Sequence, residues 1–333
     1  MPIKIDRART QDLALQFDEA LELVRNEFEG LDAHRQYRNA FARLLKPDPL
    51  RRVLMMGTDQ RDMFVSELRR AIEDCVACNG HIFDFGAGDG QTFALVAASV
   101  PQGTCVSIKE PNPEYVKNYV AFLKTQPHLR LGMVVAAGFE EMDTAAARLG
   151  ETLPQDGSID LGLAVHMIYF VRDLSSSVIR MVRFLKPGGV LFLVVTDDTA
   201  GYTGLVLNRF IEGGGHTARN LSVLAELQRL LTLSTEGASR ITEVLKAAGV
   251  PVEIRVQRQP SRFYGHNLAD LIALSGINVL ASVEDLGKFE AAAALLRDKP
   301  EAVDLQIEDA GPRKGMWSVN AGPQWIVEFR RVH

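Results

Sequence analysis

The residues whose types and spacing point most directly to chemistry lie in the stretch 81–90, His-Ile-Phe-Asp-Phe-Gly-Ala-Gly-Asp-Gly. A short apolar run ends at Asp84, and glycines follow at alternate positions, Gly86, Gly88 and Gly90. Apolar residues at helical spacing come next, so the pattern predicts a strand, a glycine loop and a helix. In a parallel α/β sheet such a loop lies at the carboxyl ends of the strands, where ligands bind, and glycine lets the backbone approach them closely.

The spacing of the glycines narrows the kind of ligand. A dinucleotide fingerprint needs Gly-x-Gly-x-x-Gly, but Gln91 stands where its third glycine belongs. A phosphate-binding P-loop needs Gly-Lys-Ser/Thr, which is absent here. The loop, with Ala87 inside it, resembles motif I of class I S-adenosylmethionine-dependent methyltransferases. A tight glycine turn in another kind of α/β protein is the alternative.

Composition sets broad limits. The 333 residues are 47% hydrophobic and 24% charged, which is ordinary for a globular protein. The net charge is -5 and the sequence has no dense block of Lys and Arg, so we expect no nucleic-acid partner. We expect no membrane span and no secretory signal, and the three cysteines do not make a disulfide framework. A cytoplasmic protein without a metal site is expected. Cys75 and Cys78 are expected to be buried structural thiols.

The N-terminal part reads as helical. Apolar residues at helical spacing predict helices over 10–29, 32–45 and 59–78. We expect residues 1–80 to form a helical cap that contributes to the acceptor pocket.

From residue 81 on, apolar runs alternate with helical patterns, which predicts a doubly wound, mainly parallel Rossmann-like sheet. Residues 81–333 are expected to form the cofactor-binding domain, with helical inserts at about 197–240 and 265–322. The predicted strands are 81–85, 104–109, 131–136, 159–166, 190–196, 252–257 and 324–330.

Candidate binding residues follow the predicted strands. Glu110 lies about twenty residues beyond the glycine loop, where an acidic side chain accepts hydrogen bonds from ribose hydroxyls. Tyr115 opens the next helix and either stacks on an adenine or packs in the core. Phe139 follows the third strand, where methyltransferases contact the adenine. His166, with Tyr169 and Phe170, ends the fourth strand, where a methyl donor and its acceptor would meet.

Together these pieces resemble class I methyltransferases over about 80–196. Over most of its length the chain also resembles the histamine N-methyltransferase family, through Glu110-Pro-Asn-Pro, His166-Met-Ile-Tyr-Phe, His34-Arg-Gln-Tyr and Gly315-Met-Trp-Ser-Val-Asn. The resemblance implies cofactor contacts from Pro111 and His166. It implies acceptor contacts from Tyr37, Phe41, His166, Tyr169, Phe170, Tyr202 (a tryptophan in that family) and Asn320. The glutamate that holds the imidazole in that family is Leu50 here, which argues against histamine itself.

The sequence hypothesis is in-line methyl transfer from S-adenosylmethionine, without a metal, to a small molecule, most plausibly at an amine nitrogen. S-adenosylhomocysteine is the product. His166, whose ordinary pKa is about 6.5, is either a general base or a structural residue of the turn, and Tyr169 is its expected catalytic neighbour. The alternatives are a sulfur or oxygen acceptor, such as a thioether or amino-acid-like metabolite, and a protein that binds the cofactor without transfer.

Overall fold

The computed structural model describes residues 3–4, 10–44, 46–47, 53–54, 56–196, 201–212, 226–227, 229, 239–277 and 286–332. These residues form two compact units, which we describe one at a time. The first, which we call the sheet unit, comprises 62–195, 225–258 and 325–333. The second, the helical unit, comprises 1–61, 196–224 and 259–324.

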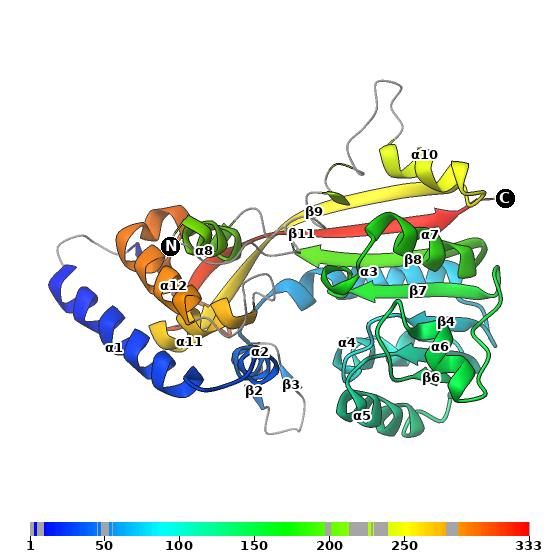
Figure 1. The fold of residues 1–333 in the computed structure, drawn as a ribbon, viewed down its shortest axis with the longest axis horizontal. Coiled ribbons are helices and arrows are strands. Elements are labelled where there is room, and N and C mark those ends of the chain that lie inside the picture. The colour runs from blue at the N-terminus through cyan, green and yellow to red at the C-terminus, as the bar shows by residue number, and fades with distance from the viewer. Residues whose placement is uncertain are drawn as a thin grey trace. The chain divides into compact units, whose positions relative to one another are not determined.

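The sheet unit is built on a mainly parallel sheet (Figure 1). Its strands run in the order β11-β8-β7-β4-β5-β6, with β9 paired to β11. Strands β4, β5, β6, β7 and β8 pair in parallel, which places their carboxyl ends at one edge. The strands are β4 (His81–Asp84), β5 (Thr104–Lys109), β6 (Leu129–Val135), β7 (Ile159–Val165), β8 (Leu185–Thr196), β9 (Val252–Gly265) and β11 (Trp317–Arg331).

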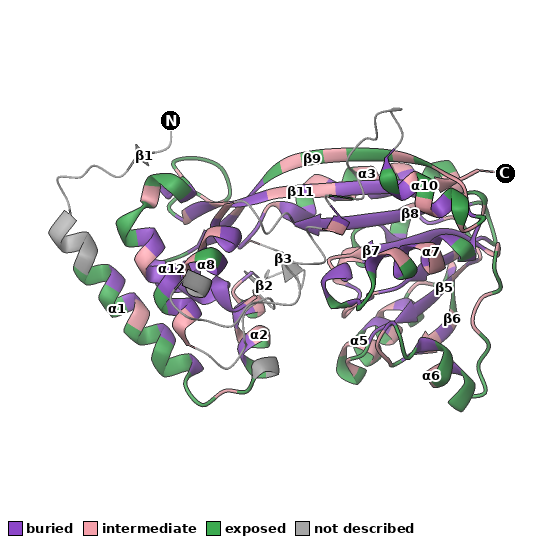
Figure 2. Ribbon diagram, turned by 45° about the horizontal axis from the view of Figure 1, so that its top comes forward, coloured by how far each residue is buried: buried purple, intermediate pink, exposed green. Residues whose placement is uncertain are grey.

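Helices cover both faces of this sheet. The helices are α3 (Gln60–Cys75), α4 (Gln91–Ala94), α5 (Pro113–Lys124), α6 (Met142–Arg148), α7 (Leu174–Phe184) and α10 (Arg240–Ala247), with short 3-10 turns at Ala97–Ser99 and Ile168–Phe170. On one face, α3, α4 and α5 pack against alternate strand residues such as Ile82 and Val106. On the other face, Phe83 and Phe85 of β4 and its loop stack with Phe184 of α7. Figure 2 shows the middle strands buried, as a sheet covered on both faces requires.

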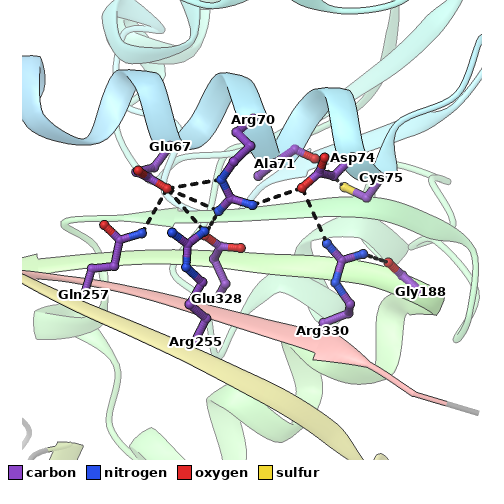
Figure 3. A network of polar contacts seen from close by, with 10 residues as sticks. All are labelled: Glu67, Arg70, Ala71, Asp74, Cys75, Gly188, Arg255, Gln257, Glu328 and Arg330. Carbon is purple, nitrogen blue, oxygen red and sulfur yellow. Dashed lines mark hydrogen bonds and ion pairs between the residues drawn. The ribbon is translucent and has the colours of Figure 1, made fainter.

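A network of charged side chains joins α3 to the antiparallel end of the sheet (Figure 3). Glu328 of β11, almost fully buried, pairs with Arg70 of α3 and with Arg255 of β9, the latter at 3.4 Å. Arg70 also pairs with Glu67 at 3.2 Å and with Asp74 at 3.0 Å. This network fixes α3 against strands that begin only at Val252 and Trp317, far later in the chain.

The helical unit contains α1 (Thr10–Phe28), α2 (Ala33–Ala42), α8 (Gly201–Glu212), α11 (Leu268–Leu274) and α12 (Gly287–Asp298), 3-10 turns Ser275–Ile277 and Pro300–Val303, and short strands β1 (Ile3–Lys4), β2 (Lys46–Pro47), β3 (Val53–Leu54) and β10 (Gln306–Ile307). The ring of Phe28 on α1 lies 4.7 Å from that of Phe289 on α12. Figure 2 shows α1 buried along one side only, as its amphipathic sequence predicts.

The predicted fold class is confirmed: a Rossmann-like, mainly parallel α/β sheet of class I methyltransferase order with an antiparallel C-terminal pair. Several predicted bounds differ. Strand β8 begins at Leu185, not at 190, because Leu185 pairs with Ile159 before a bulge restores the register at Val190. Strand β11 begins at Trp317 rather than 324. The division into 1–80 and 81–333 follows the order of motifs, whereas contacts assign α3 mostly to the sheet unit, and the cap role of 1–80 stays a prediction.

Two other expectations can be compared with the structure. Helix α3 ends at Cys75, which is partly buried, whereas Cys78 lies beyond the helix and is exposed. The expectation of two buried thiols was therefore wrong for Cys78. Burial raises the pKa of the Cys75 thiol to about 12. Within the described ranges, no helix is both long enough and apolar enough to cross a bilayer. Leu50 lies outside the described residues.

Candidate cofactor site

Glu110 joins the glycine loop (residues 85–90) to the end of β5. Its Oε2 accepts a hydrogen bond from the Gly88 amide at 3.0 Å, and its Oε1 accepts one from the Asn112 amide at 3.0 Å. The Ala87 amide donates to the Lys109 carbonyl at 3.1 Å. A carboxylate offers about four lone-pair positions, so Glu110 keeps acceptor capacity for a diol while it holds the loop.

The three glycines of the loop are required, or leave space, for different structural reasons. A Cβ on Gly86 would lie 2.3 Å from the Cβ of Met167, and one on Gly90 would lie 2.5 Å from the Tyr119 ring. Both positions are therefore closed by packing. Gly88, with φ of +54°, has no heavy atom within 4 Å of the place where a Cβ would lie. The loop thus presents open backbone at Gly88, which a ligand can approach.

Asp84 is fully enclosed at the end of β4. Its carboxyl accepts a hydrogen bond from the Tyr119 hydroxyl at 3.3 Å. The pKa of Asp84 is raised to about 7, mainly by burial and also by the nearby charge of Glu110, against the opposing effects of the Gly86 amide, the Tyr119 hydroxyl and Lys109. Around neutral pH this carboxyl is therefore close to half-ionised, and a cationic ligand beside it would favour the ionised form.

Lys109, the last residue of β5, is an almost fully buried cation at the same edge. Burial lowers the pKa of its ammonium, and the surrounding charges of Glu110, Glu140, Asp84 and Glu141 favour the protonated form. Lys109 therefore offsets part of the negative charge that the carboxylates bring to this edge of the sheet.

His166 leaves β7 in a left-handed conformation, with φ of +52°, so the strand ends one residue earlier than predicted. Its amide donates to the Val194 carbonyl at 2.9 Å, which fixes the turn against β8. The imidazole Nδ1 lies 3.4 Å from the Tyr169 hydroxyl, and the Phe64 ring packs edge-on at 6.2 Å. A non-glycine residue in this region costs about 1–3 kcal/mol, and such residues cluster at functional sites.

The remaining predicted residues of the sheet unit lie near this edge with different exposures. Phe139 is buried, its ring 6.1 Å from that of Phe85 next to the glycine loop. Tyr169 is buried beside His166, whereas Phe170 is 58% exposed. Pro111 and Tyr115 lie at the turn into α5, Pro111 exposed and Tyr115 half-buried. The structure thus brings the cofactor-binding candidates together around the carboxyl ends of β4, β5 and β7.

The other acceptor candidates belong to the helical unit. Tyr37 and Phe41 stack on α2 with ring centroids 5.9 Å apart. Tyr202 is fully buried, and its hydroxyl donates to the Leu271 carbonyl at 2.8 Å. Asn320 Oδ1 accepts a hydrogen bond from the Gly322 amide at 2.9 Å. Tyr202 and Asn320 therefore have structural partners within their own unit, and the substrate contacts of all four stay predictions.

Sequence reasoning missed three residues of the site: Phe64, Lys109 and Tyr119. Lys109 left a signal, because a lysine inside the apolar strand Val-Ser-Ile-Lys-Glu must be buried with partners. Tyr119 left a weaker one, a phenol on the apolar face of α5. Phe64 looked like any core residue of an amphipathic helix.

The part of the chain that forms the parallel strands is similar to known proteins. A family model described as a methyltransferase domain matches residues 83–193. This stretch, about a third of the chain, is similar to that family. The thiol S-methyltransferase TMT1B of Mus musculus is 27% identical over 128 residues, which cover 38% of this chain and 47% of that protein. The chain therefore matches about half the length of this curated relative.

Among solved structures, the YcgJ protein of Bacillus subtilis is 14% identical, with a TM-score of 0.47 over 82% of this chain and 99% of that one. A candidate methyltransferase from Bacillus halodurans is 17% identical, with a TM-score of 0.47 over 80% of this chain and 100% of that one.

S-adenosylmethionine is the cofactor that a methyltransferase domain implies, and the residues present fit it. Gly88 leaves open backbone, Glu110 has free acceptor capacity for ribose hydroxyls, and the carboxyl of Asp84 suits a cationic ligand. Within the part of the chain that the structure describes, no group of His, Cys, Asp and Glu side chains is arranged to hold a metal ion.

Proposed function

We propose that this protein transfers a methyl group from S-adenosylmethionine to a small molecule, at an amine nitrogen. The observation that carries the proposal is the left-handed turn at His166. The next residue, Met167, packs against Gly86, so this turn lies next to the glycine loop. When bound, the cofactor supplies an activated methyl on its sulfonium. The protein holds the cofactor through Glu110 and the glycine loop, and positioning alone is worth about 7–11 kcal/mol of such a barrier.

His166 acts on the acceptor in this proposal. An alkyl amine attacks only as the neutral base, so its proton must leave before or during transfer. The imidazole accepts that proton, and Tyr169, 3.4 Å away, holds the ring in place. The resemblance assigns acceptor contacts to Tyr37, Phe41, Phe170, Tyr202 and Asn320. The rings of the four aromatic residues would also favour a cationic product.

The test of His166 is the substitution His166→Asn. Asparagine tolerates the left-handed region much better than alanine, so the turn is kept while the base is lost. We expect the turnover number to fall about a hundredfold or more and the part of the acidic limb of the pH–rate profile that His166 contributes to disappear. The matched control is His128→Asn, since His128 precedes β6 and lies at the opposite, amino-terminal edge of the sheet. An unaltered pH profile in His166→Asn contradicts the assignment.

A second candidate is methyl transfer to a thiol, favoured by the 27% identity to a thiol S-methyltransferase over 128 residues. A thiol, like an amine, must lose its proton, so His166 would keep its role. A thioether acceptor has no proton to lose, and its turnover would be nearly independent of His166.

The acceptor class is tested by the release of S-adenosylhomocysteine against a panel of alkyl amines, alkyl thiols and thioethers. Turnover with amines supports the proposal, and turnover with thiols alone replaces it by the second candidate. Cofactor binding without turnover across the panel would favour a protein that binds S-adenosylmethionine without transferring its methyl group.

A further inference from the structure

Tyr119 connects two parts of the cofactor site that are far apart in sequence. It lies on α5, is fully buried, and is packed between the rings of Phe93 and Phe122 at 5.9 Å and 6.4 Å. Its ring covers Gly90 so closely that a Cβ at that position would lie 2.5 Å from Cδ2 of the ring. The ring therefore packs directly against the backbone of Gly90, the last glycine of the loop.

The hydroxyl of the same side chain reaches the carboxyl of Asp84, 3.3 Å away. The charged groups that face Asp84 are Lys109, the last residue of β5, and Glu110, which follows it; the Gly86 amide faces Asp84 from its own loop. Of these, Glu110 disfavours the ionised carboxyl, whereas Lys109, the amide and the Tyr119 hydroxyl favour it. In return, burial and the neighbouring Asp84 charge raise the pKa of the Tyr119 hydroxyl, so it stays a donor over the working pH range.

We propose that Tyr119 is a positioning residue for the cofactor. Its ring supports the backbone of the glycine loop at Gly90, and its hydroxyl stabilises the ionised carboxylate of Asp84 beside a cationic ligand. This inference rests on the proposed function, because it needs a ligand with an ammonium or a sulfonium group in the loop. It adds a residue that contacts no ligand and acts through Asp84 and Gly90.

The inference predicts a pH dependence that a purely structural tyrosine would not produce. In the wild-type protein, affinity for S-adenosylmethionine and for S-adenosylhomocysteine rises with pH as Asp84 ionises near pH 7. Tyr119→Phe keeps the ring and removes the donor. We expect the midpoint of this rise to move up by about 0.5–1 pH unit and affinity at pH 7 to weaken about two- to fivefold, with the two proteins converging near pH 9.

The measurement is titration calorimetry with both ligands from pH 5.5 to 9. The matched control is Tyr264→Phe, which removes a hydroxyl that donates to another aspartate, Asp59 at 3.0 Å, in the helical unit. It should leave the pH profile unchanged. In an Asp84→Asn background, Tyr119→Phe should cause no further shift, since the hydroxyl acts through the carboxylate.

The binding data distinguish a failure of the proposed function from a failure of the role of Tyr119. A wild-type protein that binds neither ligand contradicts the proposed function. A wild-type protein that binds both, with a Tyr119→Phe profile superimposable on its own, overturns the role of Tyr119. Should Tyr119→Phe fail to fold, the Asp84→Asn variant alone must flatten the binding profile around pH 7, and a persisting rise overturns the inference.

Discussion

Two carboxylates at one edge of the sheet have opposite surroundings. Glu110 accepts two backbone amides, at 3.0 Å each, which suits a charged group that binds hydroxyls. Asp84 is enclosed away from solvent, and burial raises its pKa to about 7. The difference gives the two residues different tasks: Glu110 holds the loop through two backbone amides, whereas Asp84 responds to pH and to the charge of the ligand.

The raised pKa of Asp84 predicts a cost in stability. The unfolded chain ionises Asp84 near 3.8 and the folded chain only near 7, so its effect on folding becomes unfavourable as pH rises between these values. Asp84→Asn removes this dependence. We expect the difference in free energy of unfolding, variant minus wild type, to rise by about 2–3 kcal/mol between pH 5 and pH 7.5. Urea unfolding of the cofactor-free proteins measures it, and a difference independent of pH contradicts the assignment.

Gly88 provides a second test at the level of the residue. Gly88→Ala places a methyl group in open space at φ of +54°, so it should lower stability by only about 1–2 kcal/mol. The same methyl group lies where the cofactor is expected to approach, so affinity should fall at least about tenfold. Gly150→Ala is the matched control, because Gly150 has a φ of +70° and equally open surroundings at the end of α6. Equal affinity in the two variants would place the cofactor elsewhere.

Among the elements, α3 depends on strands that follow it late in the chain. Glu328 has a 7% exposed side chain and pairs with Arg70 and Arg255, so removal of its charge leaves two cations with weaker partners. We expect Glu328→Gln to lower the free energy of unfolding by about 1–3 kcal/mol, below the value for a fully buried pair because both arginines are partly solvated.

Thermal unfolding measures this loss, and Asp74→Asn is its control. The Asp74 side chain is 44% exposed and pairs with the same Arg70, so its loss should cost less than about 0.5 kcal/mol. If the two substitutions have equal effects, the buried position of Glu328 is not what stabilises α3.

At the scale of the molecule, each unit is assembled from three separate stretches of chain. The last strand, β11, supplies Ile326, Val327 and Phe329, all buried, to the sheet unit. We therefore expect truncation after Gln324 to destabilise the sheet unit, although it removes none of its sequence motifs. Truncation after Arg331 keeps the strand and should leave the melting temperature within about 2 °C of the full chain. The comparison is a thermal melt of each protein with and without S-adenosylhomocysteine.

The sequence by itself determined the methyltransferase sheet and most of its cofactor loop. Alternating apolar runs and helical patterns specify a parallel sheet, and the glycines with Glu110 are read from spacing that is local in the chain. The limits of β8 and β11 could not be read in the same way, since a bulge at 186–189 and a long antiparallel pairing depend on partner strands. The histamine-like acceptor contacts rest on resemblance and stay predictions.

Only the tertiary structure decided how these residues are tuned. The contact of Tyr119 with Gly90 and Asp84 joins α5 to the end of β4. The hydrophobic periodicity of the sequence predicts single helices and strands, but not which residues of two different elements meet. The left-handed turn at His166 follows from its pairing with β8, and the high pKa of Asp84 follows from its burial. Residue types and their local order are properties of the chain, whereas burial, charge balance and backbone strain arise only when distant segments pack together.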